Sequence, residues 1–343
     1  MALSGTWSFT VTRDDIIREA MLNIGAIGEA EIPTAQETTD CARKLNMMVK
    51  QWMGTMDFAP GLKMWTRQRG DLFLALTKGQ YALGPTGDNW AAAVTGATAP
   101  GQTYNQTQLS ANAPAGATTL NVISTAAMNV NDYVGIVVNS DIQWTTIATI
   151  TSPTQFTIPA PGLAASTPAN NYVWNYTTKA QRPIAIVTCV LRNIQVNDTP
   201  MNTLTLQDYE ILPTKTMPTF IADPSAYYYE SQITDPTGLS VINGNGQLYL
   251  DVGGAQDVTK HLHIVYLRPV MDFNNPTDNP EYPQQWYRPL CWGLAREISG
   301  MFDAIWTQDM DANYRESMAM AHEADAETTS IYFQPNSGDP FSP

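Results

Sequence analysis

Positive charge is scarce in this chain of 343 residues. Its 18 Lys and Arg residues stand against 32 Asp and Glu residues, which gives a formal net charge of −14. Proteins that bind nucleic acid without sequence preference neutralise phosphates with Lys and Arg. The charge balance therefore argues against a protein that binds strongly to the phosphates of DNA.

Cysteine is scarce as well. Cys41, Cys189 and Cys291 are far apart and odd in number, so neither a disulfide framework nor a zinc-binding pair can be read from them. Cys41 and Cys291 lie within apolar helical patterns, where a buried thiol is the expected state. The sequence predicts a protein that is made in a reducing cytoplasm.

Long hydrophobic runs are also missing. No stretch approaches the roughly 20 apolar residues of a membrane-spanning helix. No early apolar run has the basic flank and the small-residue cleavage site of a signal peptide. We therefore expect a soluble protein with no membrane partner, long enough for two or three domains and a substantial core.

Two amphipathic helices are predicted near the N-terminus, the first beginning at Thr12 and the second at Thr34. Asp15 and Glu37 each follow three residues later, which is the spacing of a capping box. Apolar residues then recur at intervals of three and four, so each helix must bury one face. The residues expected on these core faces are Ile16, Ile17, Ala20, Ile24, Leu45, Met48 and Trp52.

Strands are predicted to follow a break at Phe58–Gly61. Residues 65–83 alternate between polar and apolar, with Lys78-Gly79 as a tight turn. The glycine-rich run that continues to Gly87 could suggest phosphate binding, but it lacks the lysine and the following helix of a P-loop. We interpret this run as the punctuation of a hairpin.

The segment 88–175 differs in composition from the rest of the chain. It contains three charged residues, Asp88, Asp132 and Asp141, and no Lys or Arg. Short alternating runs separated by turn residues predict a small all-β module inserted into the host fold. Two interpretations of its surface stay open: a contact surface for a neighbouring subunit, a tail component or a glycan, or an insertion without a ligand.

A second pair of helices is predicted at residues 284–302 and 309–330. Pro289 and Gly293 lie inside the first of them, which should therefore kink or begin late. The tail that follows is rich in Gly, Pro and aromatic residues and is expected to become ordered only on a partner. The predicted core face of the first helix carries Trp286, Leu290, Leu294 and Ile298.

The sequence favours neither a metal site nor an enzyme active site. His261 and His263 alternate on one face of a predicted strand, and two such side chains can ligate one ion. A third ligand at a recognisable spacing is missing, and His322 lies on a distant helix, so neither a metal nor another cofactor is expected. No nucleophile elbow or Ser/His/Asp order stands out. We expect no enzyme, and the enzymatic alternative is a tail-bound peptidoglycan or glycan hydrolase.

The order of these motifs resembles the head-to-tail adaptor family of short-tailed phages, whose members are also called head-completion, connector or packaged-DNA stabilisation proteins. The similarity begins with T-x-x-D-I-I-x-x-A-x-x-x-I-G at residues 12–25. It continues with T-A-x-E at 34–37 and L-N-x-M-x-x-x-W at 45–52. It covers roughly residues 10–87 and 181–330. Further matching positions are Gly79, Tyr81, Gly84, Gly87, Arg182, Pro183, Asp208 and Tyr209.

The resemblance implies an α+β fold with a four-helix bundle from the N- and C-terminal helices, a small antiparallel β-sheet and an inserted all-β domain. Residues 1–87 would hold the helical hairpin and the first strands, and 88–175 the insertion. Residues 176–330 would supply the remaining strands and helices, and 331–343 a portal-docking arm. The implied docking candidates are Ile331, Tyr332, Phe333, Tyr314 and Met318.

The resemblance also implies a mechanical function in the virion. A twelve-fold ring would bind the portal protein, extend the DNA channel, help to retain packaged DNA and dock the tail nozzle. Packaged DNA would pass without specific binding, which the acidic balance favours because like charges repel. The protein would act at the portal–tail junction after synthesis in the host cytoplasm. The alternative is a tail or decoration protein whose β insertion binds a host-surface glycan.

Overall fold

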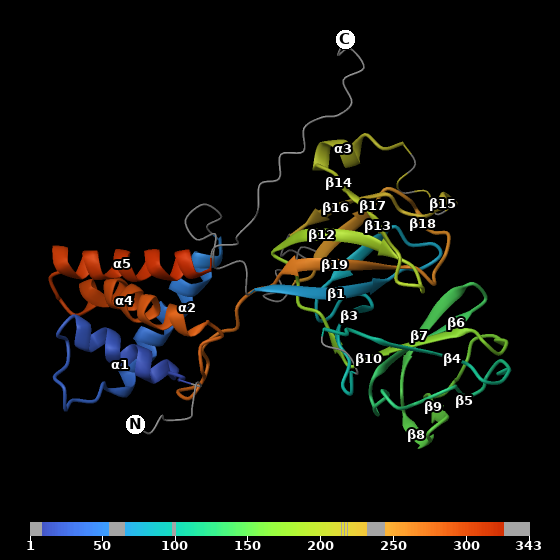
Figure 1. Cartoon of the computed structure of the whole chain (residues 1–343), viewed down its shortest axis with the longest axis horizontal. Helices are drawn as coiled ribbons and strands as arrows, with labels where there is room; N and C mark the ends of the chain where they lie inside the picture. Colours follow the sequence, from blue (N-terminus) through green and yellow to red (C-terminus); the bar gives the residue numbers. More distant parts are fainter. Residues whose placement is uncertain are drawn as a thin grey trace, which may run out of the picture. The chain divides into compact units, whose positions relative to one another are not determined.

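A computed structural model describes residues 9–54, 66–97, 101–213, 215, 217, 219–231 and 244–325 of the chain. These residues form nineteen strands in five sheets and five α-helices. The chain divides into two compact units (Figure 1). The first, which we call the helical unit, combines Met1–Thr66 with Val270–Pro343, and the second, the sheet unit, is Arg67–Pro269.

The predicted fold class is wrong, because the protein is mostly β. Strands take up 30% of the described residues and helices 24%, and these residues do not show a four-helix bundle. One small antiparallel sheet was predicted, but the structure has five sheets, and the largest of them has six strands. Many strands have only two to five residues, too short to leave a clear period of two in the sequence. Their contribution to the fold was therefore underestimated.

The helical unit is arranged around one central helix. The helices α1, α2 and α5 each pack against α4, and α1 also packs against α2 (Figure 1). A short 3-10 turn, η2, precedes α4 and packs against α5, and a second, η3, follows α4. The bounds are α1 Arg13–Asn23, α2 Ala35–Gly54, η2 Gln284–Trp286, α4 Tyr287–Ile298, η3 Ser299–Met301 and α5 Gln308–Ala324.

Local sequence signals set where these helices begin. The predicted capping boxes are present: Thr12 and Asp15 exchange hydrogen bonds at the start of α1, and Thr34 and Glu37 do so at the start of α2. Pro289 lies in the first turn of α4, where the missing N–H is not needed, and η2 carries the chain into that turn. The predicted late start is therefore confirmed.

The predicted core faces meet in one hydrophobic cluster around α4. Trp52 is half-buried beside this cluster, with its ring 6.3 Å from that of Trp286. Gly293 gives α2 and α4 room to approach, because a Cβ there would lie 2.8 Å from the Trp52 ring and 2.9 Å from the sulfur of Met48. The buried predicted residues are Ile16, Ile17, Ala20, Ile24, Leu45, Met48, Trp286, Leu290, Leu294 and Ile298.

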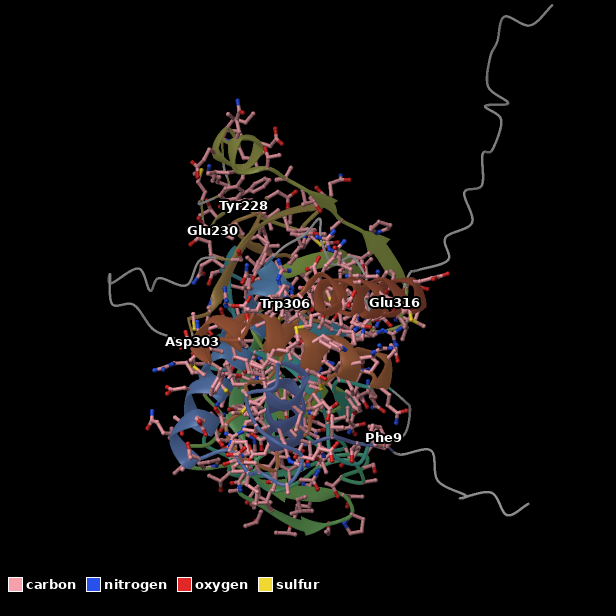
Figure 2. All side chains as sticks on the ribbon, turned by 90° about the vertical axis from the view of Figure 1, so that its left-hand side faces the viewer. Phe9, Tyr228, Glu230, Asp303, Trp306 and Glu316 are labelled. Atoms are coloured by element: carbon pink, nitrogen blue, oxygen red, sulfur yellow. The ribbon has the colours of Figure 1, made fainter. Side chains whose placement is uncertain are left out.

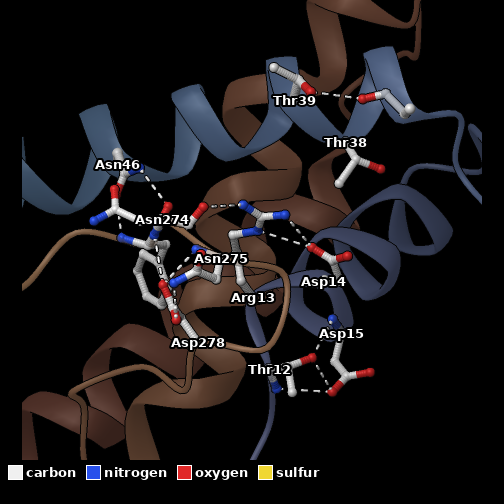
Figure 3. A network of polar contacts seen from close by, with 12 residues as sticks. Thr12, Arg13, Asp14, Asp15, Thr38, Thr39, Asn46, Asn274, Asn275 and Asp278 are labelled. Carbon is white, nitrogen blue, oxygen red and sulfur yellow. Dashed lines mark hydrogen bonds and ion pairs between the residues drawn. The ribbon is translucent and has the colours of Figure 1, made fainter.

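A polar network fastens α1 and α2 to the segment that leads into α4 (Figure 3). The buried guanidinium of Arg13 donates to Asp14 at 2.8 Å and to the carbonyl of Asn274 at 3.2 Å. The amide of Asn46 on α2 closes a pair of hydrogen bonds with the backbone of Phe273, at 3.2 and 2.9 Å. These bonds satisfy backbone groups that burial would otherwise leave unpaired.

The main sheet of the sheet unit has the order β11-β3-β1-β19-β12-β13, and every neighbouring pair is antiparallel. Strand β3 lies within residues 88–175, which were predicted to be an inserted module, yet it pairs with β1 in this sheet. The bounds are β1 Arg67–Phe73, β3 Trp90–Ala93, β11 Thr178–Lys179, β12 Ala185–Arg192, β13 Asp198–Pro200 and β19 His261–Leu267.

A second four-stranded sheet packs against the core side of the main sheet. Its order is β14-β16-β17-β2, and the predicted pairing of Tyr227–Tyr229 with Leu248–Leu250 is confirmed. The connecting turn predicted at residues 243–246 lies partly outside the described residues. The bounds are β2 Gln80–Leu83, β14 Asn202–Thr203, α3 Leu206–Glu210, β15 Ile221–Ala222, β16 Ala226–Glu230, β17 Gly246–Leu250 and β18 Gly254–Ala255.

The insertion contributes two further sheets with a hydrophobic cluster of their own, in the orders β4-β10-β6-β7 and β5-β9-β8. A shared aromatic cluster joins it to the main sheet: the ring of Phe73 lies 4.9 Å from Trp144 and 5.8 Å from Trp174. The bounds are β4 Asn105–Gln108, β5 Thr119–Asn121, β6 Tyr133–Val138, β7 Asp141–Thr146, β8 Thr149–Ser152, β9 Gln155–Thr157 and β10 Tyr172–Tyr176.

A Gly79→Ala substitution tests the tight packing of the turn before β2. The backbone of Gly79 accepts a hydrogen bond from Leu250 at 2.8 Å, and an added Cβ would overlap the carbonyl of Val252. We expect the free energy of unfolding to fall by about 1–3 kcal/mol, as for other overpacked sites. Denaturant unfolding followed by circular dichroism measures it.

The matched control is Gly28→Ala, because a Cβ at Gly28 would meet only a carboxylate oxygen of Glu31 at 3.9 Å. This change should move the unfolding free energy by no more than about 0.5 kcal/mol. Equal effects of the two substitutions would contradict the close approach at Gly79.

Candidate functional site

One face of the main sheet is polar, and it provides the candidate site. Side chains alternate along β1, so that Leu72 points into the core while Arg67, Arg69 and Asp71 share the other face. Strand β19 lies beside β1 with Asp71 directly opposite His263. Charged and imidazole groups from distant parts of the sequence therefore meet on one surface.

Asp71 is the centre of this arrangement, and only 2% of it is exposed. Its Oδ1 accepts a hydrogen bond from Nδ1 of His263 at 2.8 Å and lies 3.3 Å from Nε2 of His261. The hydroxyl of Thr103 donates to the other carboxylate oxygen. Burial alone would raise the pKa of Asp71, but the hydrogen bonds from the two histidines outweigh it and hold this pKa far below its ordinary value.

His261 is fully buried behind Asp71. Its Nε2 also lies 3.2 Å from the hydroxyl of Tyr104, whose ring packs edge-on against the imidazole. Its Nδ1 is buried and has no hydrogen-bond partner among the residues that the structure describes. Because the carboxylate of Asp71 can only accept a hydrogen bond, its contact with Nε2 is favourable when that nitrogen carries a proton.

A groove of about 500 Å³ opens over this cluster. It runs between the main sheet and residues 101–106, which lead into β4 of the insertion, and its walls include Asp71, His263 and Arg192. A neighbouring hollow of about 470 Å³ is lined by Arg67 and Arg69. Gly101 and Thr103 line both, so the two hollows adjoin on the polar face of the sheet, and we call them together the groove.

The arginines of this groove differ in how they are paired. Arg192 makes two hydrogen bonds to the carboxylate of Asp198, at 2.7 and 2.8 Å. The bonds to Asp198 raise the pKa of Arg192, while the pKa of Asp198 falls. Arg69 is exposed, and within the described ranges it has neither a hydrogen bond nor an ion pair. Arg69 is therefore the cation of the groove that is open to a further partner.

The two histidines predicted to share a face do so, but the sequence did not indicate what they contact. Both face Asp71, and the described residues contain no group of three or more His, Cys, Asp and Glu side chains that could hold a metal ion. Asp71, Thr103, Tyr104 and Arg192 were missed. The only signal of the cluster was the aspartate in β1, which precedes Leu72 and Phe73.

The predicted docking residues on α5 are half-buried. Met318 packs against the hydrophobic cluster of the helical unit, and the guanidinium carbon of Arg296 lies 5.3 Å from the ring centre of Tyr314. Ile331, Tyr332 and Phe333 lie outside the described residues. Elsewhere in this unit, a groove of about 490 Å³ between α1 and α4 is lined by Phe9, Trp292 and Cys291, and burial raises the pKa of the Cys291 thiol to about 12.

An Asp71→Asn substitution tests whether the carboxylate holds the cluster together. It removes the charge that faces two imidazoles in a buried site, so we expect the free energy of unfolding to fall by about 3 kcal/mol. Asp223→Asn is the matched control, because Asp223 pairs with Lys260 at an exposed site. The control should cost less than about 1 kcal/mol. Equal losses would show that Asp71 acts only as a surface charge.

Acid titration provides a second test. The pKa of Asp71 is lowered on folding, so its contribution to stability is complete above its ordinary pKa of about 4 and is lost as the pH falls below that value. We expect the wild-type protein to lose stability more steeply than Asp71→Asn between pH 4.5 and pH 3. Chemical denaturation at fixed pH values measures both proteins. An equal dependence of the unfolding free energy on pH in the two proteins over this range would contradict the lowered pKa of Asp71.

Comparisons with known proteins add no family to these observations. No protein-family model and no curated protein sequence matches the chain. Among the described residues, no helix has the length and apolar character needed to cross a membrane. A proposal of function therefore rests on the order of the chain's own motifs and on the two units that they form.

Proposed function

We propose that this protein is a virion structural protein, a head-to-tail adaptor that binds the portal of a short-tailed phage. The observation that carries the proposal is the order of the adaptor-like motifs, which covers roughly residues 10–87 and 181–330. Each motif taken alone fits many proteins. Their sequence along one chain is the specific feature.

The placement of the motifs in space supports this proposal. The two N-terminal helices that resemble the family pack on α4, which comes from the C-terminal region of similarity. Similarly, Tyr81 on β2 and Leu248 on β17 are paired in one sheet although they come from different matching regions. Segments on both sides of the insertion thus build common units, as parts of one ancestral fold would.

The charge distribution is also consistent with an adaptor. The helical unit holds nine Lys and Arg against twenty Asp and Glu, and the sheet unit holds nine against twelve. A ring that extends a DNA channel must let DNA pass, and an acidic surface repels phosphates over the range of the Debye length. Packaged DNA would pass through such a ring without specific binding.

The proposed ring consists of twelve copies at the portal–tail junction, with the portal on one side and the tail nozzle on the other. Tyr314 and Met318 are half-buried against α4 and its neighbours, so they present only part of their surface to a partner. The proposed portal anchor is therefore the apolar and aromatic triplet Ile331, Tyr332 and Phe333. A ring of identical copies would use heterologous interfaces that close by rotation.

Native mass spectrometry of the protein mixed with the portal ring of its phage tests the proposal. We expect saturation near one copy for each portal subunit. A chain ending at Ser330 should bind at least tenfold more weakly, because it lacks the proposed anchor. The matched variant is Ile331→Ser, Tyr332→Ser, Phe333→Ser in the full-length chain, which keeps the tail length and removes its apolar side chains.

The outcomes separate the parts of the proposal. Full binding by the truncated chain and by the triple variant would keep the adaptor function but place its anchor on the helices. Absence of portal binding by the wild-type chain would overturn the adaptor function. Binding of the wild-type chain to a glycan array would then support the alternative, in which the β insertion recognises a host-surface glycan.

A further inference from the structure

The two units offer surfaces of opposite charge. The helical unit carries most of the acidic excess, whereas the groove on the sheet unit is lined by Arg67, Arg69 and Arg192. Asp71 also lines this groove, but two histidines and Thr103 already occupy its carboxylate. Arg192 is already paired with Asp198, so the end of the groove at Arg69 is the part suited to an anionic partner.

Arg69 is the group most able to receive that partner. It lies on the exposed face of β1, two residues from Arg67, which places the two Cα atoms about 7 Å apart. Gly101 borders the guanidinium, since a Cβ built at Gly101 would lie 3.4 Å from Nη1 of Arg69. Gly101 has a positive φ of +75, a conformation that glycine adopts readily, and its lack of a side chain keeps this wall of the groove low. A carboxylate can approach over that wall.

A matching acidic surface lies on α5. Asp309, Glu316 and Glu323 are exposed and seven residues apart, so they form one stripe with carboxylates about 10.5 Å apart along the helix axis. Figure 2 labels Glu316 among the side chains of α5. Four other residues between them are exposed: Ala312, Arg315, Ala319 and Met320. Ala312 and Ala319 are also seven residues apart, so their small side chains let another surface come close to the carboxylates from that side of the stripe.

We propose that the arginine end of the groove binds the acidic stripe of α5 from a second copy of this chain. The hollow beside Arg69 has about 470 Å³, which admits carboxylate side chains but not the helix itself. The contact joins two different patches, so it is heterologous and can repeat from copy to copy around a ring. This contact is a subunit interface of the proposed ring, so the inference rests on the proposed adaptor function.

Charge reversal in two different chains tests the contact. Arg69→Glu places like charges against the stripe, and Glu316→Arg places like charges against the groove. We expect each variant alone to self-associate at least tenfold more weakly than the wild-type chain in sedimentation velocity at 50 mM salt. Raising the salt to 500 mM should weaken the wild-type association, because the Debye length shortens.

An equimolar mixture of the two variants is the decisive measurement. Residue 69 of each variant then meets an opposite charge at residue 316 of the other, so alternating copies have two favourable contacts. We expect the mixture, and also the double variant Arg69→Glu, Glu316→Arg, to recover association. Arg43→Glu is the control, because this exposed arginine lies on α2 and belongs to neither surface, and it should leave association unchanged.

Three results would overturn the proposal: equal sedimentation of the wild-type chain and both single variants, failure of the mixture to recover, or loss of short-duplex DNA binding in Arg69→Glu with association intact. The last result would assign the groove to phosphates. The proposed adaptor function is tested separately by portal binding. Portal binding with no charge-dependent self-association would keep the adaptor and reject this interface.

Discussion

The buried carboxylate of Asp71 is the interaction on which the sheet unit depends. A charge that is removed from water must be compensated by hydrogen bonds or opposite charge, or it destabilises the fold by several kcal/mol. Here the compensation comes from β19 and from Thr103, which precedes the first strand of the insertion. One ionised group therefore fixes where the insertion leaves the main sheet. The groove exists because its two walls are held at this point.

The helices could be predicted from the sequence because their signals are local. A capping residue, a carboxylate three positions later and apolar residues at helical spacing are all contained within about 15 residues. The bounds of α1 and the residues around α4 were accordingly close to the prediction. How the helices pack was predicted wrongly, as a four-helix bundle, because the same apolar faces can form a bundle or surround one central helix.

The sheets and the candidate site depend on contacts that the sequence does not display. Strand β3 was assigned to the insertion because the composition changes at Asp88, although Trp90 pairs with Leu72 of β1. Asp71 and His263 are 192 positions apart, and only the register of β1 with β19 places them side by side. Register is set by turns and by burial across the whole sheet. A single aspartate in β1 could not reveal it.

The division into two units also has a consequence for synthesis. The helical unit is built from both ends of the chain, so α1 and α2 leave the ribosome before Arg67–Pro269 and about 230 residues before α4. At typical translation rates this interval is on the order of 10–50 s. The sheet unit contains all its own strands and can fold during that time, whereas α1 and α2 have only each other to pack against until α4 is made. Each nascent chain must therefore carry two partly uncovered amphipathic helices until its C-terminal region emerges, and a chain released early cannot complete the helical unit at all.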